Sequence, residues 1–369
     1  MWHRMPLTRS AARRSHRALS SDDVLATVFS FITPEAGFGA ATACKTLRDA
    51  WRRRCRGMLR VHRQRIGTFT YSDHCVAYGD GVMVPDYSFN RDSGSLKTYA
   101  VDGRHLSDLN MCLNTPRVVA LRGDGTAWVL LSDDRRIICV RLAEAPSAPS
   151  NEILRRTRDA TDAYNEVLMS ISITSAYNIT TFTLAGDKLL VLFVDAVYPE
   201  IAMKIGVYDN TTGTFLREFP LEDVLGERNP GDAERSCIAV QGDMLYIARQ
   251  LDDTVDVYNW HEGTCLRRFG GEGEGQRLSF NQPFGIALRG KTMYVSEVDG
   301  RRIQVIRLAD DDDSEPDVLQ VIPSPDGARL GGLCLSGDRL WCVGPKYPRE
   351  ELANLETTYV HVFGPCYPE

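Results

Sequence analysis

The stretch IALRGKTMYVS, residues 286–296, consists of two short apolar segments on either side of Gly290. A glycine between two such segments is typical of a β-hairpin, because glycine adopts the backbone conformations that a tight turn requires. Five further stretches repeat this arrangement, and in each an aspartate follows the glycine: Gly79, Gly123, Gly186, Gly242 and Gly337. The sequence therefore predicts six hairpins of one kind.

The six hairpins recur at a nearly regular interval. Their glycines are separated by 44, 63, 56, 48 and 47 residues, and the intervals hold further strand-like segments such as RIICVRL, TVDVYNW and RIQVIRL. Three or four strands in a unit of about 45 residues are typical of the blades of a β-propeller. A parallel α/β sheet would need helical crossovers between its strands, and none is visible. We therefore expect a mainly β chain with a six-bladed β-propeller over residues 61–369.

The last unit lacks a fourth strand of its own after residues 359–363. We expect residues near Ile66–Tyr71 to supply this strand and so to close the ring. A segment from near the start of the chain would then pair with the end of the chain.

One of the six units carries a more specific pattern. The stretch from Gly271 to Leu308 resembles an NHL-type repeat, with matching residues at Phe280, Pro283, Gly285, Ile286, Tyr294-Val295 and Arg302-Ile303. Glu297 stands where that family usually has Asp. The other units match only loosely, so the resemblance supports an NHL-like propeller more than any NHL activity.

The first 60 residues differ in character from the rest. Residues 1–18 hold five arginines and no acidic residue, which predicts a disordered basic tail, with an organelle transit peptide or a nuclear signal as alternatives. From residue 19 the apolar residues follow at helical spacing, and residues 19–60 predict three short helices. Such a small module cannot bury much apolar surface by itself, so it is expected to pack on a neighbour or a partner.

Residues 19–56 resemble an F-box. The match includes Leu19, Val24-Leu25, Val28-Phe29, Phe31-Ile32, Pro34-Glu35, Cys44-Lys45, Leu47 and Trp51. Ser20 replaces the usual proline, and Gly37 and Gly39 replace the usual leucine-rich second helix. The resemblance implies docking to the Skp-type adaptor of a cullin–RING (SCF-type) ubiquitin ligase. The implied adaptor-binding residues are Leu19, Val24, Leu25, Val28, Phe29, Ile32, Cys44, Leu47 and Trp51. The alternative is a helical cap that packs on the propeller.

The distribution of charge separates the same two regions. Residues 1–70 carry a net charge of +10 and the remaining 299 residues carry −16. An acidic main body argues against nucleic acid as the principal partner, because phosphate binding needs a basic surface. No apolar run reaches 18 residues, so no membrane span is expected. The ten cysteines form no CxxC pair, which predicts reduced thiols and a cytoplasmic or nuclear protein.

Motifs for catalysis or cofactor binding are not found. The seven histidines accompany no GxSxG elbow, and there is no GxxxxGK[ST] loop. We therefore expect a non-catalytic protein without a cofactor. Metal-dependent hydrolases and lyases also use six-bladed propellers, and Asp195, Asp253 or Glu297 could supply ligands in that alternative.

The connections after the second strands of the blades are expected to gather on one face around the propeller axis. They offer aromatic and arginine residues, which are common anchors of protein recognition. The predicted target-binding residues are Tyr87, Arg91, Arg136, Tyr198, Arg249, Arg301, Tyr347 and Arg349. The leading hypothesis is thus a substrate-recognition subunit of a ubiquitin ligase, whose propeller face binds a target protein. The alternatives are a propeller enzyme with a helical cap and an RNA-binding NHL-type propeller.

Overall fold

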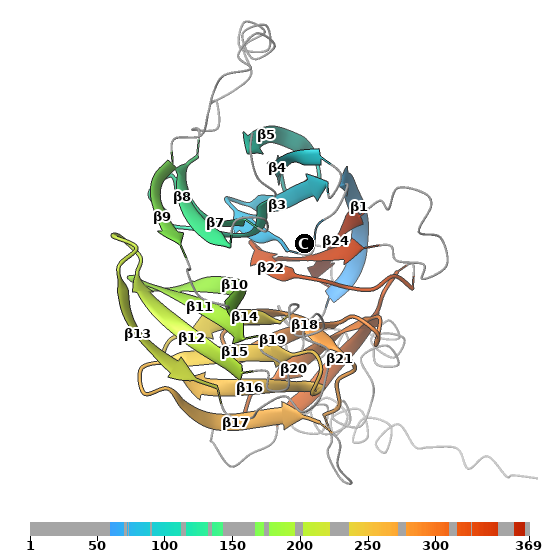
Figure 1. Ribbon diagram of the computed structural model, residues 1–369. Coiled ribbons are helices and arrows are strands. Elements are labelled where there is room, and N and C mark those ends of the chain that lie inside the picture. Colours follow the sequence, from blue (N-terminus) through green and yellow to red (C-terminus); the bar gives the residue numbers. More distant parts are fainter. Residues whose placement is uncertain are drawn as a thin grey trace, which may run out of the picture.

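The computed structural model describes residues 60–69, 72, 74–88, 91–111, 116–131, 135–142, 167–172, 177–195, 202–221, 236–271, 278–309, 316–325, 327–345 and 358–365. All regular structure within these ranges is β-strand, arranged as six four-stranded sheets around a central axis (Figure 1). Each sheet is one blade, so the predicted six-bladed β-propeller is confirmed. The described ranges contain no helix with the length and hydropathy of a membrane span.

The first three blades follow one another along the chain. Blade 1 contains β2 (Val76–Tyr78), β3 (Gly81–Ser88), β4 (Arg91–Tyr99) and β5 (His105–Met111). Blade 2 contains β6 (Pro116–Leu121), β7 (Thr126–Leu131), β8 (Arg136–Arg141) and β9 (Val167–Ser172). Blade 3 contains β10 (Tyr177–Ala185), β11 (Lys188–Asp195), β12 (Ala202–Asp209) and β13 (Phe215–Pro220).

The other three blades complete the ring. Blade 4 contains β14 (Cys237–Gln241), β15 (Met244–Arg249), β16 (Thr254–Asn259) and β17 (Thr264–Gly270). Blade 5 contains β18 (Pro283–Arg289), β19 (Thr292–Glu297), β20 (Arg302–Arg307) and β21 (Asp317–Pro323). Blade 6 contains β22 (Leu333–Ser336), β23 (Arg339–Pro345), β24 (Thr358–Pro365) and β1 (Arg60–Phe69).

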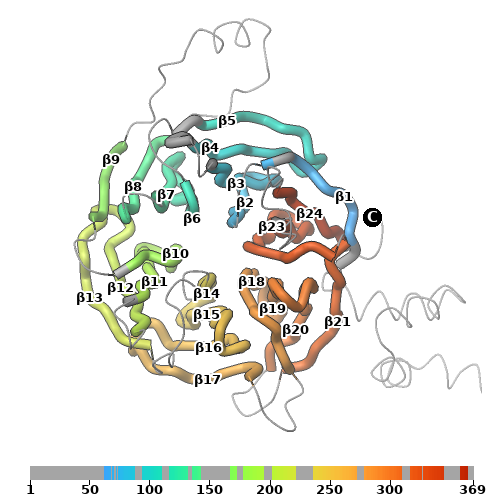
Figure 2. Tube along the Cα trace, turned by 45° about the vertical axis from the view of Figure 1, so that its right-hand side comes forward, coloured from blue at the N-terminus to red at the C-terminus, as the bar shows by residue number. Residues whose placement is uncertain are grey.

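Within each blade the first strand lies nearest the axis and the fourth lies on the rim (Figure 2). Each predicted hairpin joins the first and second strands of a blade. The glycine in each of these six turns has a positive φ, between 54° and 78°. Only glycine adopts this conformation without steric cost, which explains why the same residue recurs in every blade.

The ring is closed as the sequence indicates. β1 pairs antiparallel with β24, from Arg60 opposite Pro365 to Phe69 opposite Thr358. The predicted segment near residues 66–71 therefore supplies the fourth strand, but the strand begins earlier, at Arg60. It does so because β24 extends to Pro365 and offers backbone partners that far.

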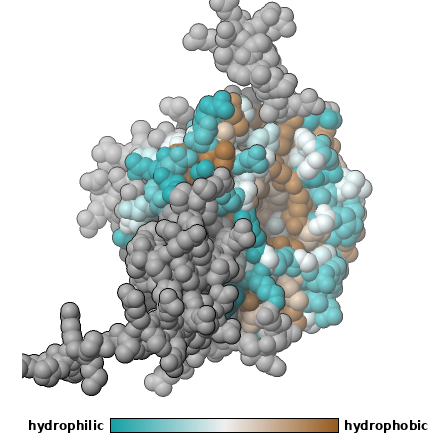
Figure 3. Space-filling model, turned by 180° about the vertical axis from the view of Figure 1, so that it is seen from behind, coloured by the Kyte–Doolittle hydropathy of each residue, from teal (hydrophilic) through white to brown (hydrophobic). Residues whose placement is uncertain are grey.

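The core consists of apolar side chains packed between neighbouring sheets. Trp128 and Trp341 are fully buried, and β1 contributes Ile66 and Phe69 to the cluster that joins blades 6 and 1. Exposed apolar side chains are found mainly on the outer strands, for example Val167 and Phe215. The visible surface in Figure 3 shows hydrophilic residues along the rim with apolar residues between them. Packing between blades thus supplies most of the apolar burial that holds the ring together.

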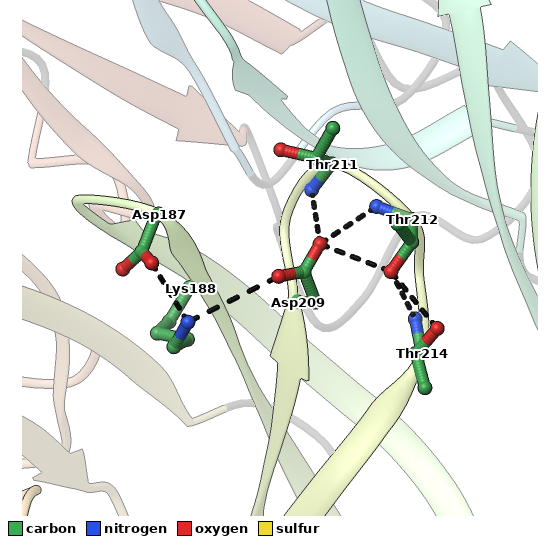
Figure 4. A network of polar contacts seen from close by, with 6 residues as sticks. All are labelled: Asp187, Lys188, Asp209, Thr211, Thr212 and Thr214. Atoms are coloured by element: carbon green, nitrogen blue, oxygen red, sulfur yellow. Dashed lines mark hydrogen bonds and ion pairs between the residues drawn. The ribbon is translucent and has the colours of Figure 1, made fainter.

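The turn between β12 and β13 shows how one outer hairpin is held (Figure 4). Asp209 Oδ1 accepts hydrogen bonds from the backbone N–H groups of Thr211 at 2.9 Å and Thr212 at 2.8 Å. The neighbouring Asn210 is buried, and its Oδ1 accepts a 2.7 Å bond from Nε1 of Trp128 in blade 2. Asn210 also begins an Asn-Thr-Thr glycosylation pattern, yet its side chain is held between two blades.

The cysteines of the described residues are all free thiols, and five of the six are buried: Cys75, Cys139, Cys237, Cys334 and Cys342. Residues 1–18, and all of the predicted helical module except Arg60, lie outside the described residues. The nine implied adaptor-binding residues lie outside them too.

Candidate functional site

One face of the propeller combines two sets of connections. These join the second strand of each blade to the third, and the fourth strand of one blade to the first strand of the next. Because successive strands of a blade are antiparallel, both sets come to the same side of the ring. We call this side the axial face, and we call the side that carries the six glycine turns the opposite face.

The predicted target-binding residues have different surroundings. Tyr87 and Arg249 are buried, with 4% and 2% of their surface exposed, so their side chains are not available at the surface of the axial face. Arg136 is half-buried and Arg301 is exposed. The side chain of Arg91 lies outside the described residues, as do Tyr198, Tyr347 and Arg349.

Arg249 belongs to an ion-pair network of blade 4. Its Nη1 lies 3.0 Å from Asp256 Oδ2, and its Nε lies 2.8 Å from Asp252 Oδ2. Arg268, on the neighbouring strand β17, donates to both oxygens of Asp256 at 2.7 and 2.9 Å. Asp256 is fully buried, so two guanidinium groups compensate the desolvation of one carboxylate. Arg249 thus fixes the connection between β15 and β16.

A second buried carboxylate lies at the equivalent place in blade 5. Glu297 is fully buried and accepts hydrogen bonds from Arg302 Nε at 2.9 Å, Gln304 Nε2 at 2.6 Å and the backbone N–H of Asn281 at 3.0 Å. These donors surround the carboxylate that the metal alternative would use as a ligand. Among the described residues, no group of three His, Cys, Asp or Glu side chains is arranged to hold a metal ion.

The other two residues considered for a metal have different positions. Asp253 lies in the connection between β15 and β16, and its Oδ1 accepts a 2.6 Å bond from the backbone N–H of Gln282. Gln282 belongs to the connection that enters blade 5, so this bond ties two blades together. The side chain of Asp195 lies outside the described residues.

The residues of the NHL-like pattern contribute to the packing of blade 5 and to its contacts with the neighbouring blades. Phe280 packs in the core between blades 4 and 5. A Cβ atom on Gly285 would lie 2.6 Å from the carbonyl oxygen of Gly331, so only glycine fits this approach of blade 5 to blade 6. Arg302 pairs with Glu297 across the turn. The pattern therefore describes how a blade is built and joined to the next one.

A small cavity opens at the centre of the ring, and sequence reasoning missed it. It is lined from five blades by His74, Arg117, Val118, Thr180, Thr181, Ser236, Cys237 and Phe284. The space open to water there measures about 10 Å³, enough for about one water molecule. Its lining residues lie at or just before the innermost strands, so the cavity belongs to the axial face.

The lining of this axial cavity is largely buried and carries a positive charge. Thr180, Thr181 and Ser236 are at most 7% exposed, and Arg117 and His74 are half-buried. Polar groups that converge on a hollow at the propeller axis can hold a small ligand or the tip of a larger one. Their positions gave no sequence signal, because they come from five separate segments between residues 74 and 284.

Comparison with known proteins supports the fold alone. No protein-family model matches the chain, and no match was found among curated proteins. The calcium-binding protein regucalcin from Agrobacterium tumefaciens superposes with a TM-score of 0.50 at 10% identity, covering 84% of this chain and 98% of that chain. A luciferin-regenerating enzyme superposes with a TM-score of 0.50 at 12% identity, covering 81% of this chain and 92% of that chain. The chain is thus similar to six-bladed propellers in architecture.

Proposed function

We propose that this chain is a non-catalytic recognition subunit of a cullin–RING ubiquitin ligase. In this proposal the F-box-like segment docks a Skp-type adaptor, and the axial face of the propeller binds a target protein. The observation that carries the proposal is the direct connection of the F-box-like segment, residues 19–56, to the strand that closes the ring, which begins at Arg60.

The direction of β1 supports adaptor docking and target binding at different faces of the propeller. Phe69, at the end of β1, lies opposite Thr358, the first residue of β24. β24 follows the connection between the second and third strands of blade 6, so Phe69 lies toward the axial face. Arg60 pairs with Pro365 at the other end of both strands. The chain therefore enters the propeller from the opposite face.

The mechanism that follows from this arrangement is proximity. β1 has ten residues, and at about 3.3 Å per residue the point of entry lies about 30 Å from the axial end of the strand. In this proposal a target on the axial face and an adaptor on the N-terminal segment would be held on one polypeptide chain. The catalytic step of ubiquitin transfer would belong to other subunits, and this chain would raise the effective concentration of the target.

A pull-down with purified Skp-type adaptor tests the adaptor half of the proposal. The full chain is expected to bind, and a Val28→Asp/Phe29→Ala double variant is expected to lose binding, because both apolar side chains belong to the implied docking stripe. The matched control is Val167→Asp/Phe215→Ala, which makes the same two changes at positions of the propeller that are 55% and 51% exposed.

The outcome separates the proposal from its alternatives. Loss of binding in the first variant alone supports adaptor docking through the F-box-like segment. Absence of binding by a folded wild-type chain contradicts it, and metal analysis of the purified propeller then becomes the next measurement for the enzyme alternative.

A further inference from the structure

Two buried thiols meet where the ring closes. Cys75 immediately precedes β2, the innermost strand of blade 1, and Cys334 belongs to β22, the innermost strand of blade 6. The two side chains are 2% and 8% exposed and share one core cluster, although 259 positions separate them along the chain. We call this contact between blades 1 and 6 the seam.

The Cys75 side chain reaches from blade 1 onto the backbone of blade 6. Its Sγ lies 3.6 Å from the carbonyl oxygen of Gly332 and 3.8 Å from that of Trp341. Both residues flank Cys334, since Gly332 precedes it by two positions and Trp341 pairs with it on β23. The pKa of the Cys75 thiol is raised first by burial and next by a hydrogen bond with the Cys334 thiol. The two thiols are therefore neighbours across the seam.

A third buried thiol in the same blade points elsewhere. Cys342 follows Trp341 on β23, but it packs in the core between blades 5 and 6. Successive side chains of a strand point to opposite faces of the sheet, so Trp341 faces blade 1 and Cys342 faces blade 5. Cys334 shares the seam cluster with Trp341. Cys75 thus has Cys334 as its partner, and within the described part of the chain these thiols form no metal-binding group of three.

The position of this pair matters for ring closure. With free thiols, the described residues close the ring by the pairing of β1 with β24 and by packing at the seam. A bond between Cys75 and Cys334 would tie the first blade to the last and enclose the chain of blades 1 to 5 in one loop. Such a bond restricts the unfolded chain, and the restriction grows with the length of the loop.

We propose that Cys75 and Cys334 form a reversible disulfide across the seam of the propeller. Two thiols that the fold holds side by side have a high effective concentration for each other, which favours their disulfide over mixed disulfides with small thiols. The inference goes beyond the proposed recognition function and does not depend on it.

The oxidant is a low-molecular-weight disulfide such as oxidised glutathione. The thiolate of Cys334, the more exposed of the two residues, attacks one sulfur atom of oxidised glutathione, releases one glutathione thiol and forms a mixed disulfide. The Cys75 thiolate then attacks the Cys334 sulfur and releases the second glutathione thiol. Two protons and two electrons thus pass from the cysteine pair to glutathione, and an excess of reduced glutathione reverses the exchange. Because both thiols are buried in the closed ring, the exchange takes place while the seam is open.

The test refolds the full chain from urea with equal concentrations of reduced and oxidised glutathione, so that burial does not prevent the exchange. The remaining thiols are alkylated, and the chain is digested with trypsin. Mass spectrometry is expected to detect residues 66–91 linked to residues 330–339, two peptides with one cysteine each. A link from residues 66–91 to residues 340–346, which contain Cys342, would overturn the proposal. The absence of any link in a refolded chain would do the same.

Thermal unfolding measures whether the bond stabilises the ring. The oxidised chain is expected to melt about 5 °C or more above the chain reduced with dithiothreitol, because a disulfide that closes a long loop stabilises the fold. Cys75→Ala and Cys334→Ala should each remove this difference. The matched control is Cys342→Ala, the same change at a buried thiol on the next strand, which should keep it. An unchanged difference in Cys75→Ala, or a linked wild-type chain that melts together with the reduced one, would contradict the assignment.

Discussion

Phe69 is the residue whose truncation tests ring closure most directly. It lies near the axial end of β1, is 1% exposed, and packs edge-on against Tyr99 of blade 1 with ring centroids 5.6 Å apart. It also shares a core cluster with Trp341 and Val360 of blade 6. Its side chain therefore joins the strand that closes the ring to the blades on both sides of the closure.

The expected cost of Phe69→Ala follows from this burial. A buried phenylalanine removes about 150–250 Å² from water, which at about 25 cal/mol per Å² corresponds to about 4–6 kcal/mol. Measured Phe→Ala changes in cores cost about 3–5 kcal/mol, since the site relaxes in part. We expect about 4 kcal/mol for Phe69→Ala. Phe215→Ala, on another outer strand but 51% exposed, should cost about 1 kcal/mol or less.

The assay is urea unfolding of the full chain followed by tryptophan fluorescence. With a slope of about 3 kcal/mol per M, a loss of 4 kcal/mol lowers the midpoint by about 1.3 M, and the control shifts it by about 0.3 M. Equal midpoints for the two variants would refute the conclusion that β1 closes the ring. As a second measurement, deletion of residues 1–59 should preserve the transition, and deletion of residues 1–71 should abolish it or shift it sharply.

Three further predictions concern buried and turn residues. Asp256→Ala should lower the free energy of unfolding in urea by about 3–5 kcal/mol, because the buried Arg249 loses the carboxylate of Asp256. A loss as small as that expected for replacing an exposed aspartate would contradict the importance of this ion-pair network. The pKa of Asp209 is lowered, chiefly by the hydrogen bond from the backbone N–H of Thr212. The ionised Asp209 carboxylate therefore stabilises the folded chain above pH about 4, and this stabilisation is lost as the pH falls through the lowered pKa. Asp209→Asn should therefore reduce stability at pH 7 but not at pH 2, and an equal loss at both pH values would refute this assignment. Burial raises the pKa of the Cys75 thiol well above its ordinary value, so maleimide should label Cys75 slowly at pH 8 until urea unfolds the chain, and fast labelling of the folded chain would contradict that burial.

Much of the fold could be read from local patterns. The turn glycines, of which Gly290 is one, need a positive φ, and alternating segments such as residues 286–296 need only a neighbouring strand to form. Even the closing strand could be placed, because the last unit was visibly one strand short. Its start at Arg60 could not, since that depends on how far β24 extends.

The candidate site was predicted less well. Two of the predicted target-binding residues, Tyr87 and Arg249, are buried and so are not presented to a partner. The sequence does not distinguish an arginine at the end of a strand that faces solvent from one that pairs with a buried aspartate. Arg249 is buried because it pairs with Asp256, which lies seven residues away on the next strand.

The sequence by itself determined the six blades and their order, because hairpin formation depends on residues that are neighbours along the chain. Only the tertiary structure decided what lies at the axis. The bulges at Arg117 and Thr180 shift the side-chain alternation of their strands, and they become visible only when each strand is paired with its partner. His74 and Phe284 are separated by more than two hundred residues and meet at one cavity because the ring closes. Such convergence arises from packing between blades, which no local pattern encodes.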